Sequence, residues 1–91
     1  MKLPLAFDAT IARDEFLRLL PGATGGDGFS QVNDVFTSRH WRIVLSPIEP
    51  LHIGSLLLDR YHVEIAFSDM SEQEIDRFMR RFSAHYQRGG G

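Results

Sequence analysis

Cysteine is absent from the 91 residues of this chain. The protein therefore forms no disulfide, offers no thiolate ligand to a metal ion and has no cysteine nucleophile. Without a disulfide framework, the cytoplasm is the expected compartment. Lysine is nearly absent as well, because nine of the ten basic residues are arginine and only Lys2 is lysine. Arginine suits bidentate contacts to carboxylate or phosphate. A general preference for arginine codons is nevertheless the favoured explanation for the excess of arginine over lysine.

The sequence also lacks a long apolar run. A membrane-spanning helix needs about 20 apolar residues, and no segment approaches that length. The first four residues, Met1-Lys2-Leu3-Pro4, do not resemble the apolar centre of a signal peptide. The net charge is −2, whereas nonspecific nucleic-acid binders are usually basic. We therefore expect neither a membrane nor a nucleic acid as partner.

Motifs of catalysis and metal binding are missing too. Ser46 and Ser55 are the loop serines nearest a histidine, His52, but neither lies in a Gly-x-Ser-x-Gly motif. His62 and Glu64 share one face of a predicted strand. We interpret them as ordinary solvated surface residues in preference to metal ligands or an acid–base pair. We expect no catalytic residue, no metal site and no cofactor, and we lean against an enzyme.

The first half of the chain predicts one strand and one helix. Lys2–Phe7 alternates like a strand, and Pro4 places it at a sheet edge. Asp8 is a suitable N-cap for a helix over Ala9–Leu20, which Pro21-Gly22 would end. The glycine-rich segment 22–28 follows a helix and precedes a strand, which is the reverse of a phosphate-binding loop.

A predicted hairpin follows this glycine-rich loop. Phe29–Phe36 reads as a strand with a bulge at Asn33-Asp34, and it should pair with the alternating strand 41–45. Pro47 and Pro50 are expected to end that second strand.

The last third of the chain predicts a long extended segment and a helix. Ile53–Phe67 is extended, with either a bulge or a tight turn before Asp59-Arg60 that would split it in two. Ser71 and Glu74 form a capping box at the start of the final helix. An apolar stripe along this helix comprises Ile75, Phe78, Met79, Phe82 and Tyr86.

Together these elements predict an α+β fold built as a two-layer sandwich. An antiparallel sheet of three or four strands would carry the N-terminal and the C-terminal helix on one face. We expect residues 1–88 to form a single domain and residues 89–91 to form a flexible glycine tail.

Arginines gather on the outward side of the final helix. Arg77, Arg80 and Arg81 lie there, and Arg88 continues toward the tail. Arg77 and Arg81 are one turn apart, so they could converge on one anion such as a phosphate. The alternative interpretation is a solvent-exposed helix face on which Glu74 and Asp76 offset the positive charge of the arginines. Binding of an anion, either phosphate or nucleic acid, is therefore the second functional hypothesis.

The chain ends in Gln87-Arg88-Gly89-Gly90-Gly91. This tail resembles the C-terminal Gly-Gly of ubiquitin and the sulfur-carrier proteins, and the resemblance implies a carrier whose activated carboxylate follows Gly90 and Gly91. It covers only these last residues. The family's β-grasp fold leads into its tail from a strand, whereas a helix leads into this one. A frayed end is the alternative interpretation.

If the sheet has only three strands, the apolar side chains exceed what two helices can cover. The alternative is that they fill a larger core in a monomer. Trp41, Leu56, Leu57 and Tyr61 are the residues we expect on an interaction surface. Small domains without disulfides or metals often gain stability through such contacts. A small non-catalytic binding or assembly module is therefore the first functional hypothesis. Its partner would be an unidentified protein or a second copy in a homodimer.

Overall fold

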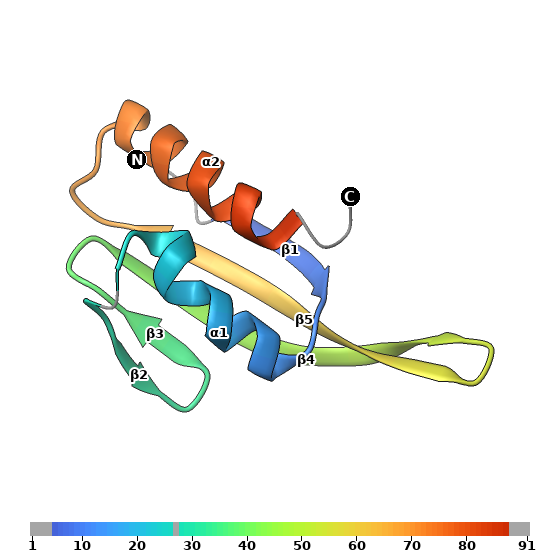
Figure 1. The fold of residues 1–91 in the computed structure, drawn as a ribbon. Coiled ribbons are helices and arrows are strands. Elements are labelled where there is room, and N and C mark those ends of the chain that lie inside the picture. Colours follow the sequence, from blue (N-terminus) through green and yellow to red (C-terminus); the bar gives the residue numbers. More distant parts are fainter. Residues whose placement is uncertain (1–4, 27, 88–91) are drawn as a thin grey trace.

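The computed structural model describes residues 5–26 and 28–87 (Figure 1). The elements in chain order are β1 (Leu5–Thr10), α1 (Arg13–Thr24), β2 (Ser30–Val32), β3 (Val35–Thr37), β4 (Trp41–Ile53), β5 (Leu56–Phe67) and α2 (Glu72–Gln87). The predicted α+β class is confirmed. The strands form one sheet in the order β1-β5-β4-β3-β2, with every neighbouring pair antiparallel. The predicted count of three or four strands is wrong, because the described residues form five.

The two helices lie on the same side of the sheet, and the β4–β5 hairpin extends well beyond them (Figure 1). The molecule is elongated as a result, with principal extents of 45 × 28 × 25 Å.

The boundary between β1 and α1 differs from the prediction. β1 runs to Thr10 in continuous register with β5, and α1 begins only at Arg13. Asp8 is consequently a strand residue, and its carboxylate contacts His62 instead of capping a helix. Pairing with a central strand satisfies the backbone of residues 5–10, which outweighs the local helix signal.

The end of α1 also differs. The helix continues through Pro21 to Thr24 and closes at Gly25, whose φ of 94° is left-handed. A proline inside a helix costs roughly 3 kcal/mol. Contacts with α2 offset this cost, since Arg81 Nε donates to the Gly22 carbonyl at 2.8 Å. Gly22 permits the close approach, because a Cβ there would lie 3.0 Å from His85 Nε2.

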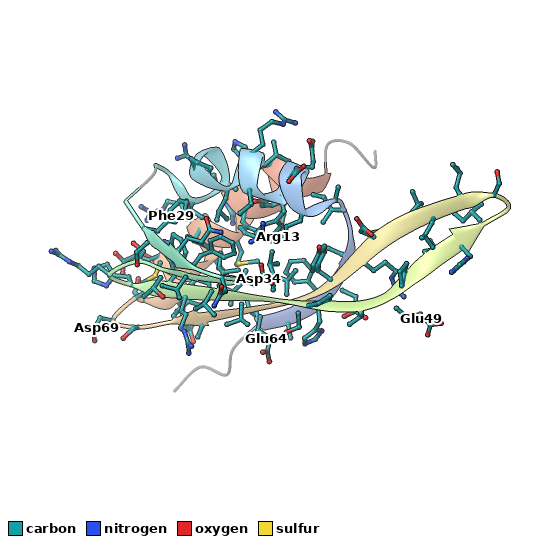
Figure 2. The ribbon with its side chains drawn as sticks, turned by 90° about the horizontal axis from the view of Figure 1, so that it is seen from below. Arg13, Phe29, Asp34, Glu49, Glu64 and Asp69 are labelled. Atoms are coloured by element: carbon teal, nitrogen blue, oxygen red, sulfur yellow. The ribbon has the colours of Figure 1, made fainter. Side chains whose placement is uncertain are left out.

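Asn33 and Asp34 form a two-residue turn instead of the predicted bulge. Val32 pairs with Val35 across this turn, so the expected single strand is divided into β2 and β3. Asn33 has a φ of 55°, a conformation that asparagine tolerates better than most residues. The Asp34 carboxylate accepts a hydrogen bond from Arg13 Nε at 2.8 Å, and Figure 2 shows these side chains pointing toward one another.

The prolines of β4 do not end the strand, contrary to the prediction. β3 pairs with β4 only at residues 42–44, so Pro47 has β5 on one side and no strand among the described residues on the other. A proline is tolerated on such an edge because its missing N–H would point to solvent. Pro50 lies in an irregularity of register between Ile48 and Leu51.

The turn that we expected before Asp59-Arg60 lies earlier, at Gly54-Ser55. Ile53 pairs with Leu56 across it, and Gly54 has a φ of 59°. A positive φ at the first central residue suits a two-residue hairpin and favours glycine. β5 then runs from Leu56 to Phe67 without a break, and the irregular register belongs to the proline-containing β4.

The hydrophobic core lies between the helices and the sheet. Its buried residues are Phe16, Leu20 and Ala23 of α1, Phe36, Trp41, Ile43, Leu45, Val63 and Ile65 of the sheet, and Ile75 and Phe82 of α2. Alternate residues of β4 and β5 supply the sheet side, as the sequence pattern predicted. Aromatic rings join the helices to the sheet, with Phe16 of α1 at 6.1 Å from Phe36 of β3 between ring centroids. Phe16 also stacks on Tyr86 of α2 at 4.8 Å, which joins the two helices.

The capping box of α2 is confirmed. The Glu74 N–H donates to Ser71 Oγ at 3.1 Å, and the Ser71 N–H donates to Glu74 Oε1 at 2.8 Å. The hydrogen bond from the Ser71 backbone N–H to the Glu74 carboxylate lowers the pKa of that carboxyl.

Replacing Ser71 with alanine is expected to lower the free energy of unfolding by about 1 kcal/mol, because the Glu74 N–H then loses its side-chain acceptor. Urea denaturation followed by the fluorescence of Trp41 measures this change. Ser83→Ala on the same helix is the control and should have a smaller effect. Equal effects of the two substitutions would contradict the capping role.

Candidate functional site

The distal part of the β4–β5 hairpin, residues 49–59, is the candidate site and is called the arm below. β1 pairs with β5 only as far as Arg60, and one further bond links Ile11 N–H to the Asp59 carbonyl. From Leu51 to Leu58 the two strands of the arm pair only with each other. Figure 1 shows the arm projecting past both helices and past the rest of the sheet.

The register divides the side chains of the arm between two faces. Leu51 lies opposite Leu58, and Ile53 lies opposite Leu56. Because residues alternate along β5, these two pairs share the face of Arg60 and Glu64, which points away from the helices. Figure 2 shows Glu64 on that side of the sheet. We call the four aliphatic residues Leu51, Ile53, Leu56 and Leu58 the outer patch.

The opposite face of the arm is more polar. His52 lies opposite Leu57, and Asp59 follows two residues later on the same side of β5. This is the face that carries the core residues Val63 and Ile65 farther along the strand. Leu57 is therefore an isolated leucine beside polar groups, whereas the outer patch is continuous.

Most of the arm's aliphatic side chains are in water. Leu56 is 60% exposed, Leu57 59%, Ile53 53% and Leu51 39%. An exposed apolar residue on its own is ordinary, but a contiguous group of them on a projecting element marks a contact surface.

The structure separates the four residues expected on an interaction surface. Leu56 and Leu57 lie on the arm, whereas Trp41 is only 9% exposed and belongs to the core. The Trp41 ring packs against Phe29 at 5.6 Å and Phe78 at 6.0 Å between centroids. Tyr61 is half-buried against the same core. Trp41 and Tyr61 thus face the helices, at a distance from the arm tip.

The arginines of α2 do not form one cluster. Arg77 and Arg80 border a shallow surface hollow with Gln73 and Asp76, whose carboxylate would compete with an anion. Arg81 instead donates to the Gly22 carbonyl and ties α2 to α1. Arg88 lies outside the described residues. Anion binding stays a prediction, with Arg77 and Arg80 as the pair that shares a surface.

The carrier tail, with Gly90 and Gly91, also lies outside the described residues. The described chain leads toward it through a helix and not a strand, because α2 runs to Gln87. The carrier hypothesis stays a prediction.

A polar row crosses three strands on the outer face, near the base of the arm. His62 Nδ1 lies 2.8 Å from Asp8 Oδ1, and Arg60 Nη2 lies 3.7 Å from Asp8 Oδ2. Ser46 is opposite His62 in the register, so serine, histidine and aspartate stand side by side. The sequence did not reveal this row, since it depends on the register of three separate strands.

The row lacks what nucleophilic catalysis requires. Among the described residues, the Ser46 hydroxyl makes no hydrogen bond to His62, and a catalytic serine needs that contact with its base. No polar or charged side chain in this part of the chain is buried, so the row lies open to water. The described residues also contain no group of three or more potential metal ligands. The arrangement is that of a surface ion pair.

A small cleft lies between β1 and the two helices. Its volume is about 240 Å³, and its lining comprises Phe7, Asp8, Ala9, Thr10, Ile11, Phe16, Phe82 and Tyr86. The Tyr86 hydroxyl donates to the Phe16 carbonyl at 2.8 Å. The Asp8 carboxylate contacts His62 and the Tyr86 hydroxyl is engaged with the backbone, so the cleft does not bring these two groups together as an acid–base pair.

Burial raises the pKa of the Tyr86 hydroxyl above its ordinary value of 10.0. The unfolded chain gives up this proton near pH 10, while the folded chain keeps it. The stabilisation that the protonated Tyr86 hydroxyl gives to the folded state is therefore complete below about pH 10. It is lost as the pH rises toward the pKa of this hydroxyl in the folded chain. We expect the free energy of unfolding to fall between about pH 9 and pH 11, and to fall less in Tyr86→Phe. Urea denaturation of the wild type and of Tyr86→Phe at about pH 9 and pH 11 measures the two decreases. Equal decreases in the two proteins would contradict the role of Tyr86.

Comparison with models of known protein families and with curated proteins gives no match to this sequence. No helix in the described part of the chain combines the length and apolar character needed to cross a membrane.

Proposed function

We propose that this protein is a small interaction module that binds another polypeptide through the arm. The observation that supports this proposal is the outer patch, a row of aliphatic side chains on a hairpin that projects beyond the body. Its residues contribute nothing to the buried core, which ends near Leu45 and Val63. An apolar surface placed outside the core serves binding better than it serves folding.

A second observation supports the same proposal. A two-stranded hairpin alone is at best marginally stable in water, and an apolar face on it needs a cover. Neither helix reaches the arm (Figure 1). A partner that covers the outer patch would stabilise the arm and would gain binding energy from each aliphatic side chain that leaves water.

The test removes the apolar surface without disturbing the strand. The double variant Ile53→Thr/Leu56→Thr replaces two aliphatic side chains of the outer patch, and threonine retains a high strand propensity. We expect polypeptides that co-purify with the tagged wild type from its native cell to be lost with this variant. Mass spectrometry of the retained proteins measures the loss.

Val32→Thr is the matched control. Val32 is 68% exposed, and it lies on β2 at the other edge of the sheet. The control should retain the same polypeptides as the wild type. Retention that is equal in all three proteins would exclude the arm as the binding surface.

A further inference from the structure

The free edge of β1 lies apart from the outer patch and has no part in the proposed function. We infer that this edge binds an extended segment of a different polypeptide, which pairs with β1 as a further strand of the sheet. An apolar side chain of that segment enters the cleft between β1 and the two helices.

The hydrogen bonds of β1 leave one side of the strand unpaired. The Ile11 N–H donates to the Asp59 carbonyl, and in antiparallel pairing the residues that bond to the neighbouring strand alternate. The main chain of residues 5, 7, 9 and 11 therefore faces β5, whereas that of Ala6, Asp8 and Thr10 faces outward. Among the described residues, β1 pairs with no strand except β5, so these outward groups have no partner in the sheet.

Donors and acceptors at this spacing match the main chain of an extended peptide. Each outward residue offers one N–H and one carbonyl, and an added strand bonds to all of them together. β1 also lacks the features that protect an exposed edge. Residues 5–10 contain no lysine, proline or glycine, and they keep an unbroken register with β5. The edge is therefore open to a further strand.

The edge adjoins the cleft. Asp8 and Thr10 belong to the cleft lining, although alternation along β1 places their side chains on the outer face, where Asp8 contacts His62. The main chain of these two residues is therefore what borders the cleft. A segment that bonds to the edge consequently lies along the cleft.

The cleft offers a site for one side chain of the segment. Residues that lie opposite each other on paired strands point to the same face of the sheet. Phe7 and Ala9 face the helices, since Phe7 pairs with the core residue Val63, so the segment's side chains opposite them do the same. Phe7 and Ala9 form the β1 wall of the cleft, and Phe82 and Tyr86 form its α2 wall. The inserted side chain lies between these walls.

The volume and the lining determine the kind of side chain. The cleft has a volume of about 240 Å³. A cavity of roughly 150 Å³ holds a benzene molecule, so a leucine or phenylalanine side chain fits. The Tyr86 hydroxyl already donates to the Phe16 carbonyl, and the Asp8 carboxylate contacts His62. Phe7 is 36% exposed beside the cleft, and covering it removes further apolar surface from water.

The other free edges in the described part of the chain do not combine these features. β2, at the opposite edge of the sheet, has only three residues. The strands of the arm lie beyond both helices, so no helix forms a second wall there (Figure 1). A second copy of β1 is less suited to fill the cleft, because Phe7 already contacts Phe82 of its own chain at 6.2 Å.

Titration with a synthetic peptide, followed by NMR of the ¹⁵N-labelled protein, tests the edge. The probe is a blocked heptapeptide in which four threonines alternate with valine, leucine and valine, a composition that favours an extended strand. We expect saturable shifts of the Ala6, Asp8 and Thr10 amides, together with slower hydrogen exchange of these three N–H groups. Shifts confined to other surfaces, or none, overturn the inference.

Two matched peptides separate the contribution of the side chain from that of the main chain. Alanine in place of the central leucine leaves the cleft unfilled and should raise the dissociation constant by about tenfold. Methylation of all main-chain nitrogens removes the donors and should weaken binding by about tenfold or more. Equal affinity of the three peptides would exclude strand pairing with an inserted side chain.

Ala6→Pro blocks the edge on the protein side. Because the Ala6 N–H points outward, proline there removes a donor for the added strand but no bond between β1 and β5. The dissociation constant of the leucine peptide should rise by about tenfold or more. Ala6→Thr keeps the N–H and should bind like the wild type. Unchanged fluorescence of Trp41 would show that both variants are folded, and equal binding by the two overturns pairing at this edge.

The edge and the arm fail in different ways. Ile53→Thr/Leu56→Thr should bind the peptide like the wild type, because it leaves β1 unchanged. Loss of peptide binding in that variant would place the peptide on the arm, which overturns the inference and leaves the proposed function standing. Sedimentation equilibrium without peptide tests the remaining occupant. A wild-type dimer that Ala6→Pro dissociates would make a second copy the occupant of the edge and overturn the separate partner.

Discussion

Replacing Phe82 with alanine should lower the free energy of unfolding by about 3–5 kcal/mol, which is a large share of the stability of a small domain. Phe82 is 1% exposed and lies at the centre of the aromatic core. Its ring packs on Tyr86 at 4.6 Å and on Phe78 at 6.0 Å between centroids. The substitution removes these contacts and leaves a cavity that the helix and sheet can fill only in part.

Urea denaturation, followed by the fluorescence of Trp41, measures the change. Phe7→Ala is the matched control, because Phe7 contacts the Phe82 ring at 6.2 Å but is 36% exposed on the edge strand. We expect a clearly smaller loss for Phe7. A Phe82→Ala variant with the stability of the wild type would contradict the position of α2 on the sheet.

Replacing Trp41 with alanine should have an effect of the same order, about 3–5 kcal/mol. The indole is enclosed by Phe29 and Phe78, so its removal opens the core between β4 and α2. Circular dichroism must follow this denaturation, since Trp41 is the only tryptophan. Leu57→Ala is the control, and a surface position should change stability by less than about 0.5 kcal/mol.

The Trp41 variant also distinguishes core from contact surface. If Trp41→Ala leaves the free energy of unfolding unchanged but weakens association, Trp41 belongs to the binding surface that the sequence suggested. The structure predicts the reverse for Trp41, a loss of folding stability because its indole is buried in the core.

Local signals in the sequence predicted the parts of the fold that depend on local bonds. Ser71 and Glu74 satisfy each other's N–H groups, so their spacing alone indicated the start of α2. Alternation likewise indicated which residues of β4 and β5 face the core, because side chains of a strand alternate between its two faces.

Pairing between distant segments decided the parts that the sequence misplaced. Asp8 is a good N-cap in isolation, but register with β5 makes it a strand residue. Pro21 usually ends a helix, but the contact between Gly22 and Arg81 supports another turn. Pro47 usually ends a strand, but it lies on an edge where its N–H is not needed.

The candidate site was predicted in part for the same reason. Leu56 and Leu57 were expected on an interaction surface, and they lie on the exposed arm. The sequence could not separate them from Trp41, because whether a strand residue is covered depends on how far the helices extend over the sheet. The arm exists because β1 and both helices end before the β4–β5 hairpin does (Figure 1).

Photo-cross-linking in the native cell tests the central claim that the arm contacts another polypeptide. A photoreactive amino acid would replace Leu56 on the outer patch, and in a second protein it would replace Val32 on β2. We predict a cross-linked polypeptide from position 56, and none or much less from position 32. Equal cross-linking from the two positions, or none from position 56, would contradict the assignment of the arm as the binding surface.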